Sequence, residues 1–298
     1  MKGKLIVIAG TNASGKSGLG IALAKRYGGE VVSADSRQVY RGLDLGSGKV
    51  TKEETQGVPH HLIDVCEPGA FFSMADFQRL AYDAIDGILA RGKLPFLVGG
   101  TGLYVDAVAE GYELSDRAPD LALRARLETY DTPALYEMLR EKLPDTDIDP
   151  RNRNRVMRAI ERLTADDYRP GRRSPRYDVL KLGVTWPREE LKKRIDERLE
   201  MRLRQGMVEE VQGLMDAGVS PEFLDKLGLE YRYISQYLLG QWTREQMLDE
   251  LGRAIKRFAK RQMTWFRHEE GLHWLDMSAD PKEQAAALID GFLQEQTP

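Results

Sequence analysis

The sequence predicts an α/β fold, in which a parallel sheet is flanked by helices and interrupted by a helical insertion. The apolar run Leu5–Ala9 is followed by a glycine-rich loop and a helix-like segment. The strand-like segments Glu30–Asp35 and Leu94–Val98 also lead into polar or glycine-rich loops. Residues 114–163 are charged, helix-like and without a strand pattern. Strands that alternate with helices favour a parallel sheet, and the strand-free stretch indicates a helical insertion into it.

The glycine-rich loop matches the pattern G-x-x-x-x-G-K-[ST] in the strand–loop–helix context that this pattern requires. Backbone N–H groups of such a loop, with the positive end of the helix dipole, bind a polyphosphate. We therefore expect a P-loop NTPase-like core, in which Lys16 supplies a charge and Ser17 a hydroxyl ligand for Mg²⁺. The alternative is a chance glycine turn between a strand and a helix, but it would not account for a full sequence pattern in the expected strand–loop–helix context. The loop residues are Gly10, Thr11, Asn12, Ala13, Ser14, Gly15, Lys16 and Ser17.

Polar residues follow the next two strands, at the edge where parallel sheets bind ligands. Sequential strands are usually neighbours, so we expect Asp35 near the P-loop; a turn or cap residue is an equally good interpretation of its position. Thr101 can bind a phosphate oxygen or cap the next helix, and position alone favours the cap. His60 and His61 lie in an expected short strand, Pro59–Val65. Adjacent residues of a strand point to opposite faces, which favours a structural role for the two histidines over metal binding.

The chain divides into a P-loop catalytic core, residues 1–112 and 177–298, and a helical insertion domain, residues 113–176. In the core, residues 36–49 form an expected substrate-facing loop, in which Arg41 and Lys49 also fit an exposed connector. After the insertion we expect a strand at 178–186 and a helix that starts at Pro187. Further helices are expected at 208–217, 230–239 and 244–267, a strand at 273–277, and a last helix that starts at residue 281 behind the cap Asp280.

Composition limits the class of protein. The chain has 298 residues, a formal net charge of −3 and 42% hydrophobic residues, as in ordinary globular proteins. Its single cysteine, Cys66, excludes a disulfide framework. No apolar stretch is long enough to span a bilayer, and the N-terminus has no signal-peptide pattern. We expect a cytoplasmic protein that acts as a monomer without a membrane partner.

Two runs are strongly basic. Residues 151–162 contain five arginines and one acid, and residues 253–267 contain six basic residues and no acid. A solvated helix face is the ordinary interpretation, but arginine suits phosphate and base recognition. Because both runs occur in a chain with a P-loop, contact with a nucleic acid is the favoured hypothesis.

Several runs together resemble the bacterial tRNA dimethylallyltransferases, also called tRNA isopentenyltransferases. They follow the order of that family over most of the chain and comprise Gly10–Ser17, Asp35–Gly46, Pro59–Val65, Val98–Tyr104 and Lys260–Arg267. The chain departs from the family at Gly228–Arg232, where Gly-Tyr-Lys or Gly-Tyr-Arg is common.

The resemblance implies transfer of a dimethylallyl group from its diphosphate, bound in the P-loop with Mg²⁺, to N6 of the tRNA adenosine 3′ of the anticodon. Asp35 would accept the amine proton, and Thr101 and Arg198 would contact the diphosphate. The residues implied in binding the anticodon arm are Asp35, Ser36, Arg37, Gln38, Thr101, Arg124, Asn154, Arg155, Arg158, Lys260, Arg261, Gln262, Trp265 and Arg267.

Three alternatives use the same loop. An isopentenyltransferase that acts on free adenine nucleotides would differ only in its acceptor. A P-loop small-molecule kinase would bind ATP in the loop, but it has no evident use for the arginine-rich runs. A P-loop module that binds nucleic acid without catalysis leaves Asp35 without a role.

Overall fold

The computed structural model describes residues 2–114, 120–165 and 173–295. The chain forms two compact units, one of Met1–Gly111 with Pro175–Pro298 and one of Tyr112–Ser174. The sequence-based boundaries were 1–112 with 177–298, and 113–176. No helix within the described ranges combines the length and apolarity needed to cross a membrane.

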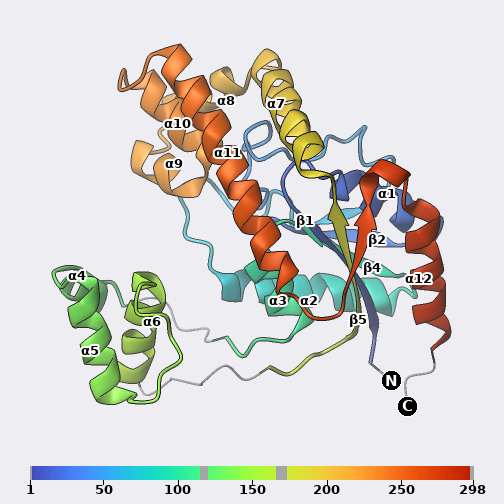
Figure 1. Ribbon diagram of the computed structural model, residues 1–298, viewed down its shortest axis with the longest axis horizontal. Helices are drawn as coiled ribbons and strands as arrows, with labels where there is room; N and C mark the ends of the chain where they lie inside the picture. The colour runs from blue at the N-terminus through green and yellow to red at the C-terminus, as the bar shows by residue number, and fades with distance from the viewer. Residues whose placement is uncertain (1, 115–119, 166–172, 296–298) are drawn as a thin grey trace. The chain divides into compact units, whose positions relative to one another are not determined.

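The first unit contains a six-stranded parallel sheet in the order β3-β2-β4-β1-β5-β6 (Figure 1). Its strands are β1 (Lys4–Gly10), β2 (Glu30–Ala34), β3 (His60–His61), β4 (Pro95–Gly99), β5 (Asp178–Thr185) and β6 (Leu272–Asp276). The parallel sheet is confirmed, but the expectation that β1 and β2 are neighbours is wrong, because β4 lies between them. Since all strands run in one direction, their carboxyl ends still share one edge.

The expected helices of the first unit occur in the expected order with differences at their ends, but the short helix at Pro221–Leu227 was not expected. They are α1 (Lys16–Arg26), α2 (Met74–Ala90), α3 (Gly102–Ala109), α7 (Arg188–Arg204), α8 (Met207–Asp216), α9 (Pro221–Leu227), α10 (Leu229–Leu238), α11 (Arg244–Arg267), the 3₁₀ turn η1 (Met277–Ala279) and α12 (Lys282–Gln294). Pro187 is the N-cap of α7 and not its first residue. The last helix starts at Lys282 with Pro281 as its N-cap, so Asp280 is not the cap.

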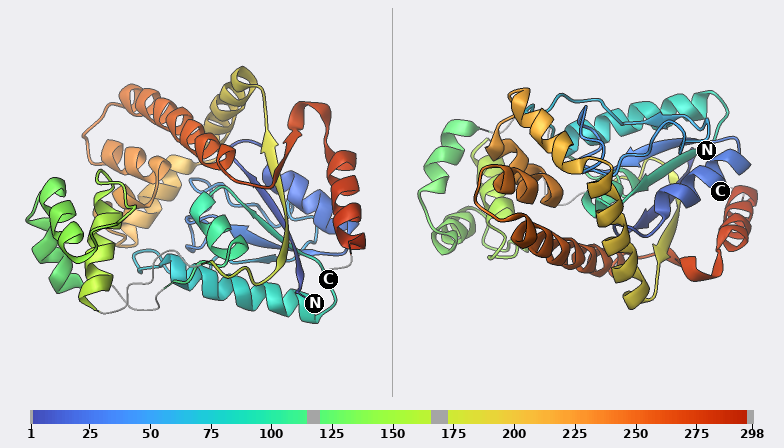
Figure 2. Two further views of the ribbon diagram at one scale, coloured as in Figure 1. Left: turned by 60° about the horizontal axis from the view of Figure 1, so that its bottom comes forward. Right: turned by 90° about the horizontal axis from the view of Figure 1, so that it is seen from above.

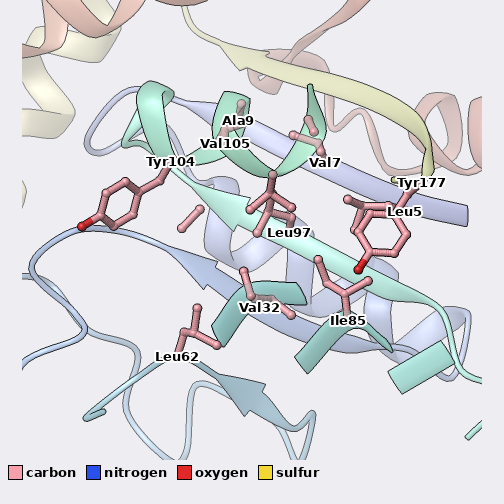
Figure 3. Close-up of a cluster of buried hydrophobic side chains, with 14 of the residues drawn as sticks. Leu5, Val7, Ala9, Val32, Leu62, Ile85, Leu97, Tyr104, Val105 and Tyr177 are labelled. Atoms are coloured by element: carbon pink, nitrogen blue, oxygen red, sulfur yellow. The ribbon is translucent and has the colours of Figure 1, made fainter. Parts of the chain in front are cut away.

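Helices cover both faces of the sheet (Figures 1 and 2), and an apolar cluster fills the space on each face. One face packs against α2 and α3, with Phe77 and Ile85 of α2 fully buried (Figure 3 shows Ile85 in this cluster). The other packs against α1 and α12, with Leu23 and Ile289 buried. Burial of side chains of this size contributes about 1.5–3 kcal/mol each, which fixes the sheet as a rigid base for the loops at its carboxyl edge.

Helices α7–α11 form a further layer around a third apolar cluster, centred on the fully buried Tyr231. This cluster includes Val39 and Leu43 from the loop after β2. The Tyr231 hydroxyl donates to Glu210 Oε1 at 3.1 Å. Glu210 in turn accepts from the backbone N–H groups of Leu45 and Gly46 at 2.6 and 3.0 Å. The loop after β2 is therefore fixed to the helical layer by packing and by hydrogen bonds.

The second unit consists, in its described part, of three helices with an apolar core. They are α4 (Leu121–Glu128), α5 (Thr132–Lys142) and α6 (Arg153–Thr164). Side chains of Asp120, Asp131 and Asn152 cap their N-termini. Leu127 and Leu135 are fully buried in the core that the three helices share. The unit therefore has its own packing centre.

Candidate active site

The P-loop joins β1 to α1 and is held from outside by α11 and by the chain just before α7. Gly15 has a φ of +84°, a backbone conformation that suits glycine. The Gln262 side chain of α11 accepts from Asn12 N–H at 2.9 Å and donates to the carbonyl of Gly100 at 2.8 Å. From the chain before α7, the indole N–H of Trp186 donates to the carbonyl of Ser14 at 2.9 Å. The loop is thus preorganised by contacts from both sides.

A pocket opens in front of the P-loop at the carboxyl edge of the sheet. Four positively charged side chains line it, but only two carboxylates within the described part of the chain. The charged lining residues are Lys16, Arg37, Arg198, Arg202, Asp35 and Glu230. The formal excess of two positive charges favours an anionic ligand.

Burial increases the electrostatic demand for an anion in this pocket. Burial, followed by the charge of Arg198, lowers the pKa of Lys16 to about 8. Burial, followed by the charge of Arg202, lowers the pKa of Arg198 to about 10. A polyphosphate in the pocket would remove this penalty, because it would favour the charged forms of both side chains.

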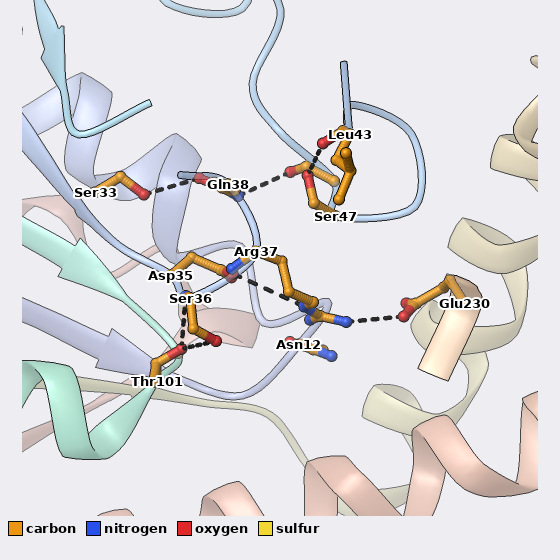
Figure 4. A network of polar contacts seen from close by, with 12 residues as sticks. Asn12, Ser33, Asp35, Ser36, Arg37, Gln38, Leu43, Ser47, Thr101 and Glu230 are labelled. Carbon is orange, nitrogen blue, oxygen red and sulfur yellow. Dashed lines mark hydrogen bonds and ion pairs between the residues drawn. The ribbon is translucent and has the colours of Figure 1, made fainter. Parts of the chain in front are cut away.

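Asp35 follows β2 and lies in the same pocket, as expected. Its Oδ1 accepts from the backbone N–H of Arg37 at 2.9 Å, and the Nε of Arg37 is 3.8 Å away (Figure 4). Oδ2 accepts no hydrogen bond from the described residues. Oδ2 is also accessible, because among the described residues the one fully buried side-chain atom without a hydrogen-bond partner belongs to Asp106. One carboxylate oxygen is therefore available to a ligand.

Thr101 lies beside the loop after β2. Its hydroxyl accepts from the backbone N–H of Ser36 at 3.2 Å and lies 3.5 Å from the Ser36 hydroxyl (Figure 4). Thr101 stands at the N-cap position of α3, but its side chain makes no capping hydrogen bond. The capping interpretation favoured by position alone is therefore wrong. Nearby, Gln38 accepts from the Ser33 hydroxyl and donates to the carbonyl of Gly48.

Comparison with known proteins identifies the family. The family described as IPP transferase matches residues 38–269, and the one described as isopentenyl transferase matches residues 3–71. The chain is 47% identical over 295 residues to tRNA dimethylallyltransferase 2 of Shewanella sediminis, covering 96% of this chain and 97% of that protein. The chain belongs to the tRNA dimethylallyltransferase family.

Solved structures of related enzymes have the same fold. The full-length tRNA isopentenylpyrophosphate transferase of Bacillus halodurans aligns with a TM-score of 0.75 and 40% identity, covering 97% of this chain and 96% of that one. A eukaryotic dimethylallyltransferase, captured acting on tRNA, aligns with a TM-score of 0.84 and 25% identity, covering 99% of this chain and 80% of that one. The P-loop-type sheet described above is therefore that of the dimethylallyltransferases.

The residues implied in tRNA binding occupy contrasting environments in this dimethylallyltransferase. On α11, Lys260, Arg261 and Arg267 are exposed. Trp265 is 42% exposed, and its indole N–H donates to Asp106 Oδ2 at 2.9 Å. Gln262 is buried and bound to the P-loop, in contrast to the exposed basic residues of the same helix.

Within the second unit of this family member, Asn154 and Arg155 are exposed on α6. Arg124 and Arg158 instead pair with the buried carboxylate of Glu161, at 3.0 and 2.7 Å. Glu161 also accepts from the backbone N–H of Asp120. Both arginines remain partly exposed around this carboxylate, with 34% and 31% of their side chains accessible.

Two sequence-based interpretations of charge are wrong. The basic run of α11 has acidic partners, because Arg253 binds Asp249 and Glu250 at 2.6 and 2.7 Å, and Lys256 binds Asp196 at 2.7 Å. Asp249 and Glu250 precede the run 253–267, and Asp196 lies on α7, so the composition of the run itself does not reveal them. Lys49 is not an exposed connector residue: its side chain is 6% exposed and is bound to Asp44 and Asp64.

The structural interpretation of the two histidines agrees with their contacts. His61 Nε2 lies 2.7 Å from Glu30 Oε2, and His60 Nδ1 lies 2.8 Å from the carbonyl of Val58. The described residues contain no group of three His, Cys, Asp or Glu side chains that could hold a metal ion.

Sequence reasoning did not place Arg202 or Glu230 at the pocket, which both residues line. Arg202 follows Arg198 by four residues, and this spacing places both on one helix face. That spacing was a signal that could have identified Arg202. Glu230 lies in the segment that departs from the family pattern, and its carboxylate binds Arg37 at 2.8 Å (Figure 4). Its role depends on the packing of α10 against the loop after β2, which has no local signature.

Proposed function

We propose that this protein transfers a dimethylallyl group from dimethylallyl diphosphate to N6 of the adenosine 3′ of the tRNA anticodon, in the cytoplasm. The observation that carries the proposal is the P-loop pocket, which combines an excess of positive charge with the free carboxylate oxygen of Asp35. The family of the chain indicates the prenyl donor and the RNA acceptor.

The pocket residues suit a reaction in which diphosphate leaves. As the C–O bond breaks, negative charge increases on the diphosphate, and preorganised donors stabilise the charge that develops. The P-loop N–H groups, Lys16 and Arg198 are such donors. The Thr101 hydroxyl, which lies beside Ser36 in the loop after β2, would be an additional one. Because the leaving group already carries the activation, transfer requires no hydrolysis of ATP.

The P-loop also suits Mg²⁺ bound through the substrate. The Ser17 hydroxyl lines the pocket and has no hydrogen-bond partner among the described residues. Mg²⁺ usually keeps several waters and binds through substrate phosphates with one or two protein ligands. In this arrangement Ser17 would hold the ion, which would neutralise part of the diphosphate charge.

Asp35 would act as the general base. N6 forms a bond to the dimethylallyl carbon, the electron pair of the broken C–O bond goes to diphosphate, and the N6 proton goes to Asp35 Oδ2. The N–H of Arg37 holds Oδ1 at 2.9 Å and so orients the carboxylate. The adenine would leave the anticodon stack to reach this oxygen.

The RNA-binding role is assigned to exposed basic side chains of both units. Lys260, Arg261 and Arg267 of α11 and Arg155 of α6 project from helix surfaces and would bind backbone phosphates. Arg124 and Arg158 would contribute after partial release from Glu161. We therefore assign the second unit, Tyr112–Ser174, to the anticodon arm, and we expect the protein to act as a monomer.

Incubation with labelled dimethylallyl diphosphate and bulk tRNA tests the proposal. We expect label in RNA, at an N6-substituted adenosine after nuclease digestion, with no consumption of ATP. Label in AMP but not in RNA would show that the acceptor is a free nucleotide. ATP-dependent phosphorylation without prenyl transfer would instead identify a kinase.

A further inference from the structure

Arg202 is a buried arginine whose guanidinium donates no hydrogen bond within the described part of the chain. The residue is 9% exposed and lines the pocket with the P-loop. Its nitrogen atoms are not sealed from solvent, because Asp106 holds the one fully enclosed unpaired side-chain atom of the described residues. A buried guanidinium without hydrogen bonds is unfavourable unless a ligand supplies acceptors. The donors of Arg202 are therefore directed at the pocket and unused.

Arg198 and Arg202 converge on one backbone position. They are four residues apart on α7 and share a helix face. Gly48, with a φ of +64°, packs against both guanidinium groups so closely that a Cβ there would overlap them. Within the described ranges the Arg198 guanidinium donates a single hydrogen bond, a long one of 3.4 Å to the carbonyl of Gly48. Two guanidinium groups with few acceptors thus lie side by side.

The two like charges need a shared anion. Burial, followed by the charge of Arg202, lowers the pKa of Arg198 to about 10. Burial also lowers the pKa of Arg202, while the carboxylate of Glu230 acts against this shift. An anion of more than one charge, placed between the two guanidinium groups, would compensate both.

Glu230 has the geometry of a support for Arg202. It is 3% exposed and lies in the first turn of α10. Oε2 accepts from Arg37 Nη1 at 2.8 Å, whereas Oε1 is 3.8 Å from Arg202 Nη1. A separation of 3.8 Å is too long for a hydrogen bond, so Glu230 attracts the guanidinium without occupying its N–H donors.

We propose that Arg202 is a second diphosphate-binding arginine and that Glu230 is its positioning residue. The inference rests on the proposed function, since it assigns the diphosphate of the prenyl donor to this pair. Arg198 and Arg202 would contact different oxygens of one diphosphate, which matches the planar donor pattern of arginine. Glu230 touches no substrate and acts through Arg202.

The first test is Arg202→Met, which keeps the length of the side chain and removes its charge. We expect the affinity for inorganic diphosphate, measured by calorimetry with Mg²⁺, to fall about 10- to 100-fold, the range for lost hydrogen bonds to a charged group. KM for dimethylallyl diphosphate should rise by a similar factor, with KM for tRNA within threefold. Arg202→Lys should recover part of the affinity, because it keeps the charge without the fork.

Arg204→Met is the matched control on the same helix. Arg204 has 76% of its side chain exposed and is paired with Glu200 outside the pocket. Its replacement should leave diphosphate affinity unchanged. If Arg202→Met binds diphosphate as tightly as the wild type, and the wild type transfers the prenyl group, the inference is wrong and the proposed function stands. Absence of transfer by the wild type would refute the proposed function, and the calorimetry would still decide whether Arg202 binds diphosphate.

Glu230→Gln tests the positioning role. We expect weaker diphosphate binding in the wild-type background and less than a twofold effect in the Arg202→Met background, because the carboxylate acts through that arginine. A lower Tm with unchanged diphosphate affinity and unchanged KM would mean that Glu230 is structural only, and the positioning role would be rejected.

Discussion

The basic residues of the pocket and those of the first half of α11 differ in how their charges are balanced. Arg198 and Arg202 are mostly buried, and the nearest described carboxylate to Arg202 is 3.8 Å away. Arg253 is 57% exposed in its side chain, and it is bound to two carboxylates at 2.6 and 2.7 Å. Among the described residues, Arg198 and Arg202 have no carboxylate within hydrogen-bonding distance, whereas Arg253 is already neutralised. An arginine that is buried without a carboxylate partner is therefore a better indication of a binding site than a run of many arginines in the sequence.

The second half of α11 differs from its first half. Lys260 has no carboxylate partner among the described residues. In the same part of the chain Arg261 has no ion pair either, and its guanidinium lies 5.5 Å from the ring centre of Phe258. These two side chains are exposed and free to bind a large polyanion such as RNA. We therefore propose that the buried cation set binds diphosphate and the exposed one binds RNA, and the following predictions separate them.

The largest effect is expected for Asp35→Ala, which removes the proposed base and leaves both cation sets in place. A general base contributes about 10²–10⁴ in rate. Single-turnover transfer should fall by this factor, while affinity for tRNA stays within a few-fold. A near-normal single-turnover rate would assign the proton transfer to another group.

Arg198→Met should lower the rate of transfer by about 10²–10³, the cost of removing one preorganised donor from a developing charge. Affinity for tRNA should remain unchanged, because Arg198 belongs to the buried set. Single-turnover rates at saturating tRNA, combined with filter binding, separate these effects. Weaker tRNA binding in this variant would mean that the two sets are not independent.

The lowered pKa of Lys16 predicts a pH dependence of diphosphate binding. Free Lys16 loses its proton above about pH 8, earlier than an ordinary lysine with a pKa of 10.5. A bound diphosphate favours the charged form, so binding above pH 8 takes up a proton and affinity falls by up to about tenfold per pH unit.

Calorimetry with dimethylallyl diphosphate at pH 7, 8 and 9, in buffers of different ionisation enthalpy, measures this uptake. Lys16→Met should bind more weakly and without the pH dependence. A wild-type affinity that is constant from pH 7 to 9 would contradict the assignment of Lys16 to the diphosphate.

A smaller effect is expected on the exposed set. Replacing Lys260 and Arg261 by Ala should lower tRNA affinity and flatten its log–log dependence on salt by about one to two units, roughly 0.7–0.9 for each lost phosphate contact. Filter binding across a salt series provides the slope. Arg253→Ala is the control on the same helix, and because Arg253 is already paired, its slope should match the wild type. Parallel lines for all three proteins would remove α11 from the RNA interface.

Local patterns predicted much of the fold. The P-loop context identified β1 and α1, and the expected range 244–267 equals α11, whose start has the capping box of Thr243 and Gln246. Strand order was not accessible, because long-range packing places β4 between β1 and β2. The short helix α9, seven residues long, gave too few turns for a periodic signal.

At the strand ends the site was predicted in part: Lys16 and Asp35 line the pocket, whereas Thr101 is not among its lining residues. It was missed where function depends on contacts between distant segments. Glu230 reaches Arg37 across 193 positions, and the contact of Gln262 with Asn12 spans 250. Gln262 itself was named from the sequence, but as a residue that binds RNA and not as one that holds the P-loop. The charge of the basic run in α11 was misjudged for the same reason, because Lys256 is neutralised by Asp196 from another helix.

The central claim is that separate cation sets bind the diphosphate and the RNA. Measuring the affinities of Arg198→Met and of the Lys260→Ala/Arg261→Ala variant for both inorganic diphosphate and tRNA tests it most directly. We predict a crossed result, in which the first variant loses diphosphate affinity and keeps tRNA affinity, and the second does the reverse. If either variant weakens both ligands to the same extent, the division of the two sets is wrong.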